Sequence, residues 1–306
     1  MKWIAKAVVQ KTISFLPYKD RINNFLQRKV SGAVYLDDQH FRWKLEHARD
    51  HWKYYLKYSN TPASSLKVLE LGTGWYPIVP MYFYLHGCNE FHSVDIYQWL
   101  KKHNYQTVIK KLTEWKENGK LKDFDQGILT ERWNSLQSFL EDNASAEQIN
   151  QSMGFQPIIG NAAEPIYSPQ QFNFICSNNV FEHIYPDVLG PIIANFRTWL
   201  TPNGLMSHFI DLSDHFAHSD TSITEFNFLR FTPAAWRLID NDIQPQNRMR
   251  WPQYIDLYRS LNIPVTEQTT RQSPRKILAA QPIHNGFTTI PVDQLRITHG
   301  YIVTKL

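Results

Sequence analysis

Residues 67–80, KVLELGTGWYPIVP, constrain the fold of this chain more than any other stretch. A short apolar run over residues 66–71 leads into Gly72 and Gly74, and the residues after them favour a helix that ends at Gly87. Glycines between a buried strand and a helix let the backbone approach a ligand closely. The segment therefore predicts a parallel α/β sheet that binds a ligand at the end of its first strand.

The bulky residues after the two glycines narrow the choice of ligand. Trp75 and Tyr76 stand where a dinucleotide-binding loop carries its third glycine, and Pro77 lacks an amide donor. Glu70, at the end of the strand, would repel a phosphate. These residues count against a pyrophosphate and so against an NAD-type oxidoreductase, which stays an alternative. They favour a ligand with a cationic amino-acid portion and an uncharged nucleoside.

Strands and helices alternate through most of the remaining sequence. Further strands are predicted at residues 90–96, 155–160, 172–178, 205–212, 263–271 and 298–306, and helices at residues 40–58, 77–87, 105–119, 186–200, 232–241 and 252–261. Gly190 and Pro191 indicate a kink or a late start in the helix that contains them, and residues 202–204 indicate a turn. Alternation of this kind predicts right-handed crossovers and a parallel sheet.

Two segments fall outside this alternation. Residues 1–62 are rich in aromatic and helix-forming residues, and they predict an N-terminal helical extension or lid. Residues 97–153 are polar and longer than a simple crossover, and they predict a helical insertion. The main domain then covers residues 63–306 and contains this insertion.

Charge and cysteine content exclude several classes of protein. Lysine and arginine number 32 and aspartate and glutamate 28, a net charge of +4 without a basic patch, so no nucleic-acid partner is expected. Cys88 and Cys176 are predicted to be buried, reduced thiols, which fits a cytoplasmic protein. No apolar run reaches the roughly 20 residues that a membrane span needs.

The N-terminal residues, 1–17, leave two interpretations open. Five apolar residues share one face of a predicted helix: Trp3, Ile4, Ala7, Val8 and Phe15. Lys11 interrupts this face. Packing against the domain is favoured, and a peripheral membrane contact is the alternative. A signal peptide is not expected, because a long apolar core and a small-residue cleavage site are missing.

Five segments, in this order, resemble the motifs of the class I S-adenosylmethionine-dependent methyltransferases. They are VLELGTG (68–74), SVDIYQWL (93–100), GNAAEP (160–165), FNFICSNNVFEHI (172–184) and WLTPNGLMSHFIDL (199–212). The aromatic-proline form of the first motif is similar to that of a bacterial subgroup. The resemblance implies a Rossmann-like α/β fold with a mostly parallel seven-stranded sheet and helices on both faces. It also implies S-adenosylmethionine as the cofactor.

The resemblance further implies which residues bind the cofactor. The implied set is Glu70, Gly72, Thr73, Gly74, Asp95, Ile96, Asn161, Ala162 and Asn178. In the family the loop after the first strand holds the methionine portion, and the acid after the second strand takes the ribose hydroxyls. A carboxylate suits that place because it accepts two hydrogen bonds. The loop after the third strand lies beside the adenine.

A second group of acids and histidines ends or follows the predicted fifth strand. In such sheets ligands bind beyond the carboxyl ends of the strands, so this group is predicted on the acceptor side. His215, supported by Asp211 or Asp214, is the first candidate for taking a proton from the acceptor, and His183 is the second. A metal site that includes His215 and His218 is one alternative, and a polar loop with internal hydrogen bonds is another. No metal ligand is assigned.

Three further residues have alternative interpretations. Arg248 and Arg250 stand next to aromatic residues, and they either bind an acceptor carboxylate or stack on the aromatics. His208 lies inside a strand and is predicted to be a core histidine. The predicted function is methyl transfer from S-adenosylmethionine to a small-molecule acceptor. A non-catalytic S-adenosylmethionine-binding or scaffold protein of the same fold is the alternative, and the methylated atom and the oligomeric state stay open.

Overall fold

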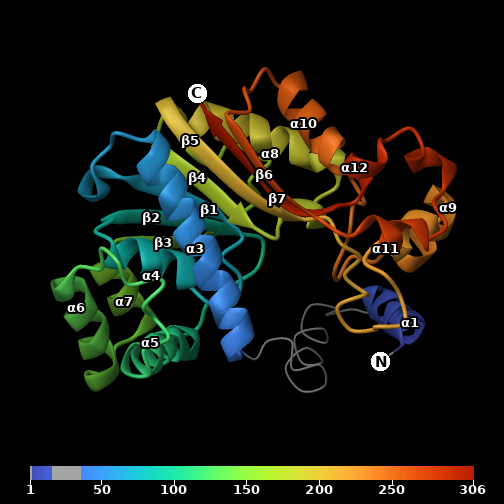
Figure 1. Cartoon of the computed structure of the whole chain (residues 1–306). Coiled ribbons are helices and arrows are strands. Elements are labelled where there is room, and N and C mark those ends of the chain that lie inside the picture. The colour runs from blue at the N-terminus through green and yellow to red at the C-terminus, as the bar shows by residue number, and fades with distance from the viewer. Residues whose placement is uncertain (1, 16–35) are drawn as a thin grey trace. The chain divides into compact units, whose positions relative to one another are not determined.

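The computed structural model describes residues 2–15 and 36–306, and Figure 1 shows their helices and strands. The chain divides into two compact units. The unit that we call the glycine-loop unit comprises Leu36–Asn178, Pro191–His208 and Val303–Leu306. The histidine unit comprises Met1–Tyr35, Asn179–Gly190 and Phe209–Ile302. Part of the predicted N-terminal extension, residues 16–35, lies outside the described residues, and its role as a lid stays a prediction.

Seven strands form one sheet in the order β3-β2-β1-β4-β5-β7-β6. Their bounds are β1 Lys67–Leu71, β2 Glu90–Asp95, β3 Phe155–Ile159, β4 Phe172–Asn178, β5 Leu200–Asp211, β6 Glu267–Gln272 and β7 Ile297–Lys305. β1 pairs in parallel with β2 and β4, and β2 pairs in parallel with β3. β7 runs antiparallel to β5, since Leu212 donates to the carbonyl of Thr298 and, at the other end, Leu306 donates to that of Gly204. The predicted mostly parallel seven-stranded sheet is confirmed.

The central place of β1 explains its apolar sequence. Leu69 and Leu71 are buried, because a parallel strand between two neighbours is covered on both of its faces. The register sets Glu70 beside Ser93 of β2 and Cys176 of β4. The strand therefore carries one carboxylate into the interior at its carboxyl end.

The glycine-loop unit holds most of the longer helices. They are α3 Asp38–Tyr58, α4 Ile78–Leu85, α5 Lys102–Glu117, α6 Thr130–Glu141 and α7 Ala146–Met153, with the short η2 Ala63–Ser65, and α8 Pro186–Trp199 runs through both units. The side chain of Asp37 begins α3 by accepting a hydrogen bond from the amide of His40. The predicted insertion at residues 97–153 contains α5, α6 and α7. Cys88 and Cys176 are free and buried, as predicted.

The histidine unit is built from shorter elements. They are α1 Trp3–Ser14, η3 Phe181–His183, η4 Asn227–Arg230, α9 Pro233–Ile239, α10 Trp251–Ser260, α11 Arg275–Ala279, η5 Asn285–Phe287 and α12 Val292–Leu295. Its core includes Ala7 of α1 together with Phe216, Phe226, Leu229 and Trp236. Within residues 2–15 and 36–306, no helix is both long and apolar enough to cross a membrane.

The structure excludes one of the two alternatives for α8 and contradicts the turn predicted at residues 202–204. α8 begins at Pro186 and continues through Pro191, without a late start. Pro191 removes one intrahelical hydrogen bond, but Ile193 and Phe196 are fully buried, and burial of such side chains contributes more than one bond. The turn predicted at residues 202–204 is part of β5. Asn203 has the left-handed φ of 63° that suits a turn, yet the strand continues on both sides of it.

Candidate functional site

The loop after β1 depends on two glycines for its conformation. Gly72 and Gly74 have φ angles of 74° and 71°, in the left-handed region that other residues rarely adopt. The amide of Gly72 donates to the carbonyl of Val94 in β2 at 2.9 Å, which fixes the loop against the next strand. A Cβ added at Gly74 would meet no atom within 4 Å. The loop therefore borders open space that a ligand can occupy.

Glu70 places a buried carboxylate directly before this loop. It is 2% exposed, and it accepts a hydrogen bond of 2.6 Å from the hydroxyl of Thr73. Burial raises the pKa of Glu70 to about 7, although the Thr73 hydroxyl and the charge of Lys44 oppose this shift. A cation bound beside Glu70 would therefore favour its charged form.

Asp95, the last residue of β2, connects the glycine loop to the end of its own strand. Its Oδ2 accepts a hydrogen bond from the amide of Gly74 at 3.2 Å, and its Oδ1 accepts one from Tyr97 at 3.3 Å. Burial raises the pKa of Asp95, and the amides of Tyr97 and Gly74 partly offset that rise. Both bonds are long for a carboxylate, which can accept further bonds from the hydroxyls of a ligand.

The aromatic residue in place of a third glycine packs beside the loop. The ring of Trp75 lies 4.4 Å from that of Trp99, measured between centroids, and Tyr97 lies 5.2 Å from Trp99. The segment after β2 thus accommodates the bulk of Trp75. The sequence does not reveal Trp99 as the partner of Trp75, because Trp99 belongs to a different loop.

The loop after β3 is held by its own hydrogen bonds. Asn161 Oδ1 accepts a hydrogen bond of 3.0 Å from the amide of Ala163, and the carbonyl of Ala162 accepts one of 2.9 Å from Asn195. Ala162 is buried, whereas Ile96, after β2, is 63% exposed. Asn161 therefore shapes its own turn, and its predicted contact with a ligand stays a prediction.

Asn178, at the end of β4, contacts a histidine that the sequence analysis missed. His51 of α3 is fully buried, with Nε2 at 2.9 Å from Asn178 Oδ1 and Nδ1 at 2.8 Å from the hydroxyl of Ser207. Because the amide oxygen accepts, Nε2 carries the proton and Nδ1 accepts from Ser207. Burial lowers the pKa of His51 to about 4, so the ring is neutral at pH 7.

Because His51 bonds the oxygen of the Asn178 amide, the amide nitrogen can donate to another partner. Nδ2 of Asn178 is buried and has no hydrogen-bond partner among the described residues. Its interaction with the Glu70 carboxylate is a weak hydrogen bond that lowers the pKa of Glu70 but is too poor in geometry to satisfy the donor. A buried donor without a partner is costly, so this amide favours a ligand that brings an acceptor.

A second group of titratable residues lies in the histidine unit, and we call it the acid–histidine cluster: Glu182, His183, Asp211, His215, His218 and His299. Asp211 Oδ2 lies 3.4 Å from His215 Nε2 and 3.6 Å from His218 Nε2, and Oδ1 lies 3.4 Å from His299 Nε2. Ser213 donates to Oδ1 from both its amide and its hydroxyl, at 2.8 and 2.6 Å. Burial alone would raise the pKa of Asp211, but His215 and Ser213 hold it well below its usual range. Asp211 is therefore a carboxylate at neutral pH.

The structure pairs His215 with Asp211 and directs Asp214 elsewhere. Asp214 Oδ1 accepts a hydrogen bond from the amide of Phe216 at 2.8 Å, and Oδ2 accepts one from Asn227 at 3.1 Å. Burial raises the pKa of Asp214, and these bonds oppose that rise. Asp214 thus shapes the loop that carries His215. His208 bonds Ser177 in the glycine-loop unit and is fully buried, as predicted for a core histidine.

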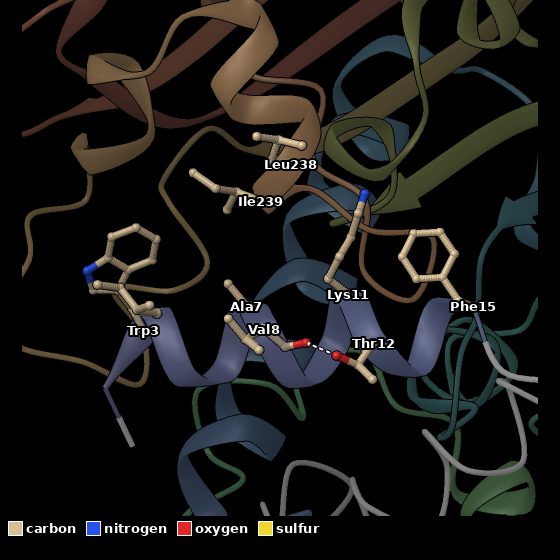
Figure 2. Close-up of a pocket in the computed structure, with 9 residues that line it drawn as sticks. Trp3, Ala7, Val8, Lys11, Thr12, Phe15, Leu238 and Ile239 are labelled. Carbon is tan, nitrogen blue, oxygen red and sulfur yellow. Dashed lines mark hydrogen bonds between the residues drawn. The ribbon is translucent and has the colours of Figure 1, made fainter.

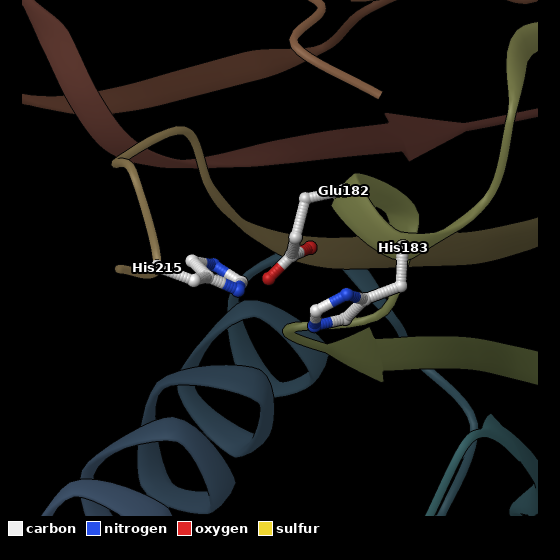
Figure 3. Close-up of side chains that lie close together, drawn as sticks. All are labelled: Glu182, His183 and His215. Atoms are coloured by element: carbon white, nitrogen blue, oxygen red, sulfur yellow. The ribbon is translucent and has the colours of Figure 1, made fainter. Parts of the chain in front are cut away.

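Glu182, His183 and His215 point toward one another (Figure 3). One donor atom from each side chain lies within 4.8 Å of the donor atoms of the other two. His183 Nδ1 lies 2.7 Å from the carbonyl of Pro245, so Nδ1 carries the proton and Nε2 keeps its lone pair. Burial, and then the charge of His215, lower the pKa of His183 to about 4. Glu182 was not among the residues predicted from the sequence, although its position next to His183 was a usable signal.

The two arginines predicted near aromatic residues bind the main chain. Arg250, fully buried, donates to the carbonyls of Leu212, Leu295 and Ile297 at 2.6, 2.7 and 2.5 Å. Arg248 donates to the carbonyls of Phe228 and Phe231 at 2.9 and 2.8 Å. It also lies 5.0 Å from the ring of Trp236. Both guanidinium groups therefore join segments of the histidine unit.

A seven-stranded sheet with a glycine loop after its first strand defines a Rossmann-like α/β protein. The sequence model of the methyltransferase-domain family matches residues 21–254, more than half of the chain. The chain belongs to this methyltransferase family, as the resemblance predicted. Membership of the aromatic-proline subgroup stays a prediction. No curated protein matches the chain.

Several solved structures are similar to the chain over most of its length. A 1,6-didemethyltoxoflavin-N1-methyltransferase from Burkholderia thailandensis, with bound 1,6-didemethyltoxoflavin and S-adenosylhomocysteine, is 12% identical, with a TM-score of 0.45 over 95% of this chain and 91% of that one. Phosphoethanolamine N-methyltransferase 2 of Haemonchus contortus, in complex with S-adenosylmethionine, is 9% identical, with a TM-score of 0.46 over 92% of this chain and 59% of that one. Likenesses this distant assign no substrate.

Proposed function

We propose that the chain transfers a methyl group from S-adenosylmethionine to a small-molecule acceptor. The observation that carries this proposal is the buried carboxylate of Glu70 beside the open space at Gly74. Burial raises the pKa of Glu70 to about 7, and the ammonium group of a bound ligand would restore its charge. S-adenosylmethionine has such an ammonium group and an uncharged nucleoside, the combination that this loop favours.

Each part of the cofactor has a complementary partner in the glycine-loop unit. Glu70 takes the ammonium group, and Asn178 Nδ2, buried without a hydrogen-bond partner among the described residues, donates to the carboxylate of the methionine portion. Asp95 accepts the ribose hydroxyls beyond its two long bonds to backbone amides. Asn161 and Ala162 border the adenine. When bound, the cofactor supplies an activated methyl group on a sulfonium, and the chain orients it.

The acid–histidine cluster supplies the proton acceptor in this proposal. During methyl transfer the bond from carbon to sulfur breaks and the bond from carbon to the acceptor atom forms. A hydroxyl or ammonium acceptor must also lose a proton, which passes to His215. Asp211, a carboxylate at 3.4 Å from His215 Nε2, stabilises the resulting imidazolium. Much of the rate enhancement would still come from holding donor and acceptor in line.

Calorimetry with S-adenosylhomocysteine tests the cofactor assignment. We expect a dissociation constant in the micromolar range, about −8 kcal/mol. Binding of NAD without any binding of S-adenosylhomocysteine would overturn the assignment. Methylation of metabolites by the purified protein with radiolabelled S-adenosylmethionine then tests activity. Tight cofactor binding with no labelled product from any extract would favour the alternative, a non-catalytic binding or scaffold protein.

We also propose that the outer face of α1 lies on an anionic membrane surface. α1 and α9 line an apolar groove of about 550 Å³ (Figure 2). Four of the residues that line it are exposed: Ile4 and Val8 to 59% each, Phe15 to 77% and Leu238 to 76%. Apolar side chains exposed together in this way mark an interaction surface.

The charge of the N-terminal residues and the hydrogen bonds that hold α1 in place both favour a membrane as the partner of the exposed apolar side chains. Residues 1–19 contain four lysines and no acid, a composition that suits anionic headgroups. Lys11 donates to the carbonyls of Arg237 and Asp240 at 2.9 and 2.7 Å, and the amide of Trp3 donates to Asp220 at 2.8 Å. These bonds hold α1 on the histidine unit, with Ala7 buried in the core and Ile4, Val8 and Phe15 exposed. The cytoplasmic location itself stays a prediction.

A further inference from the structure

Three donor groups of the acid–histidine cluster converge on one point of the histidine unit. Glu182 contributes a carboxylate that is 2% exposed, and His183 and His215 contribute imidazole nitrogens. Two histidines and one carboxylate form the ligand set of many zinc enzymes, in which a fourth position stays open. The set differs from the pair of histidines that the sequence suggested, because His218 is replaced by two residues after β4.

The spacing of the donors is close to what a metal ion requires. All three donor atoms lie within 4.8 Å of one another. Ligands of a tetrahedral zinc ion, at bond lengths of about 2.0–2.2 Å, stand about 3.4 Å apart. The three donors therefore have to approach one another somewhat when an ion binds.

Both segments that carry the ligands are tied to one short stretch of chain, residues 245–247. Pro245 accepts from His183 Nδ1, which leaves Nε2 available for coordination. Gln246 accepts from the amide of His215 at 3.3 Å and donates to the carbonyl of Ser213 at 2.5 Å. A metal-bound histidine ordinarily donates its other ring N–H to a carbonyl, as His183 does to that of Pro245, and this bond fixes the ring.

The third residue of that stretch fixes the segment that carries Glu182. Asn247 donates from its side chain to the carbonyls of Phe181 and Ile184 at 2.8 and 2.7 Å, and its amide donates to the carbonyl of Glu182 at 2.9 Å. The two ligand-bearing segments are distant in sequence, yet they share one support. Such an arrangement fixes the backbone of both ligand-bearing segments before any ion arrives.

We infer that Glu182, His183 and His215 bind a divalent transition-metal ion, with zinc as the best fit to the two imidazoles and the carboxylate. Three protein ligands leave one coordination position open, which suits an oxygen of a small acceptor. When the ion is bound, the lone pair of His215 is committed to it. The ion would then promote loss of the acceptor proton in place of His215. This last step rests on the proposed function, whereas metal binding does not.

Metal binding is tested on the full-length protein without any assay of methyl transfer. We expect the chelator-treated protein to bind about one Zn²⁺ per chain in calorimetry, and Co²⁺ to give the intense visible absorption of a tetrahedral site. His183→Ala and His215→Ala should each weaken Zn²⁺ binding by about 100-fold or more. Glu182→Gln should weaken it as well while keeping the shape of the buried side chain.

His218→Ala is the matched control, because His218 lies in the same loop with a side chain 56% exposed. It should bind Zn²⁺ like the unaltered chain. Unchanged Zn²⁺ affinity in a folded His215→Ala variant, or no stoichiometric binding by the unaltered chain, would overturn the inference. Loss of binding in His218→Ala alone would place the ion between His215 and His218 instead. Circular dichroism of each variant excludes unfolding as the cause.

If the metal inference holds and the proposed function fails, Zn²⁺ binds but S-adenosylhomocysteine does not. If the proposed function holds alone, S-adenosylhomocysteine binds and Zn²⁺ does not. Since the cofactor residues and the metal ligands belong to different units, the two calorimetric titrations report on them separately.

Discussion

The hydroxyl of Thr73 donates a 2.6 Å hydrogen bond to Glu70 Oε2, and both residues are buried. One hydroxyl does not compensate a buried carboxylate, which explains why the pKa of Glu70 stays raised, at about 7. The ligand-free protein is therefore expected to hold Glu70 partly protonated at neutral pH. A bound ammonium group would complete the site, so the site is complementary to its ligand and unfavourable without it.

Glu70→Gln should stabilise the ligand-free protein above pH 7. The folded pKa of Glu70, about 7, lies above its ordinary value of 4.5, so the folded state holds a proton that the unfolded state loses between these values. Stability contributed by Glu70 is therefore present below pH 4.5 and falls as the pH rises toward 7, by about 3 kcal/mol in all. Urea unfolding at pH 5 and pH 8 measures this change in the free energy of unfolding with pH. The Glu70→Gln variant should not show it.

The same substitution should weaken the binding of S-adenosylhomocysteine, since the ammonium group of this ligand loses its charged partner. Glu141→Gln, an exposed acid of α6, is the control, and it should change neither the slope nor the affinity. An unaltered pH dependence in a folded Glu70→Gln variant would show that Glu70 is fully ionised in the folded chain.

Asp95→Ala should weaken binding of S-adenosylhomocysteine by about 2–4 kcal/mol, because two ribose hydroxyls lose a charged acceptor. The fold should persist, since Asp95 ends its strand and its two backbone bonds are long, at 3.2 and 3.3 Å. Calorimetry on the variant and on Glu141→Ala gives the comparison. Equal affinities would assign the ribose to another residue.

The sequence predicted the strand positions of Glu70 and Asp95 better than the contacts that support these strands. Glu70 and Asp95 end short apolar runs, so their place at the carboxyl ends of parallel strands follows from local pattern alone. His51 gave no such signal, because it lies 127 residues from Asn178 and 156 from Ser207. Long-range hydrogen bonds of this kind depend on how a helix is packed, which periodicity does not specify.

The acid–histidine cluster also contains contacts that the sequence could not predict, although these residues are close together in the sequence. Asp211 and Asp214 both lie within four residues of His215, and the sequence could not choose between them. The backbone turn decides, because Asp214 accepts from Phe216 and Asn227 and so is directed away from the histidine. Glu182 went unnoticed because carboxylates in loops are usually solvated, whereas this one is 2% exposed.

Arg250→Met should destabilise the fold by about 3–5 kcal/mol, because three carbonyls lose a donor and the buried ones find no replacement. Leu212, Leu295 and Ile297 supply those carbonyls, so the loss also separates segments that the guanidinium joins. Urea unfolding measures the change. Arg259→Met, at a position whose side chain is 74% exposed, should shift the midpoint little. Similar midpoints for the two variants would contradict a structural role for Arg250.

The double variant Ile4→Asp/Val8→Asp should lose binding to vesicles that contain phosphatidylserine, by about tenfold or more. Both side chains are 59% exposed on α1, and charged replacements would no longer enter the boundary of the acyl chains. Flotation with phosphatidylserine vesicles and with phosphatidylcholine vesicles measures the effect. Val292→Asp, exposed to 54% on α12, is the matched control. Equal flotation of the double variant and the control would contradict docking through α1.

His215→Ala should lower turnover by about 10²–10⁴-fold while S-adenosylhomocysteine affinity stays nearly unchanged. The reason is that the proposed cofactor contacts come from residues 70–178, whereas His215 belongs to the histidine unit. Turnover and binding are measured on the same preparation, with His103→Ala, an exposed histidine of α5, as the control. A joint loss of affinity and turnover would show that His215 supports the cofactor site itself.

Adding Zn²⁺ to the chelator-treated chain separates the two roles of His215. Activity that requires the ion assigns the loss in His215→Ala to a missing metal ligand. Activity that is unaffected by chelation assigns it to a missing proton acceptor, supported by Asp211 at 3.4 Å. Normal turnover in His215→Ala, with or without Zn²⁺, would remove this residue from the chemistry, and His183→Ala would then be the decisive variant. If that variant is also normal, alignment of donor and acceptor alone accounts for catalysis, and the cluster only shapes the pocket.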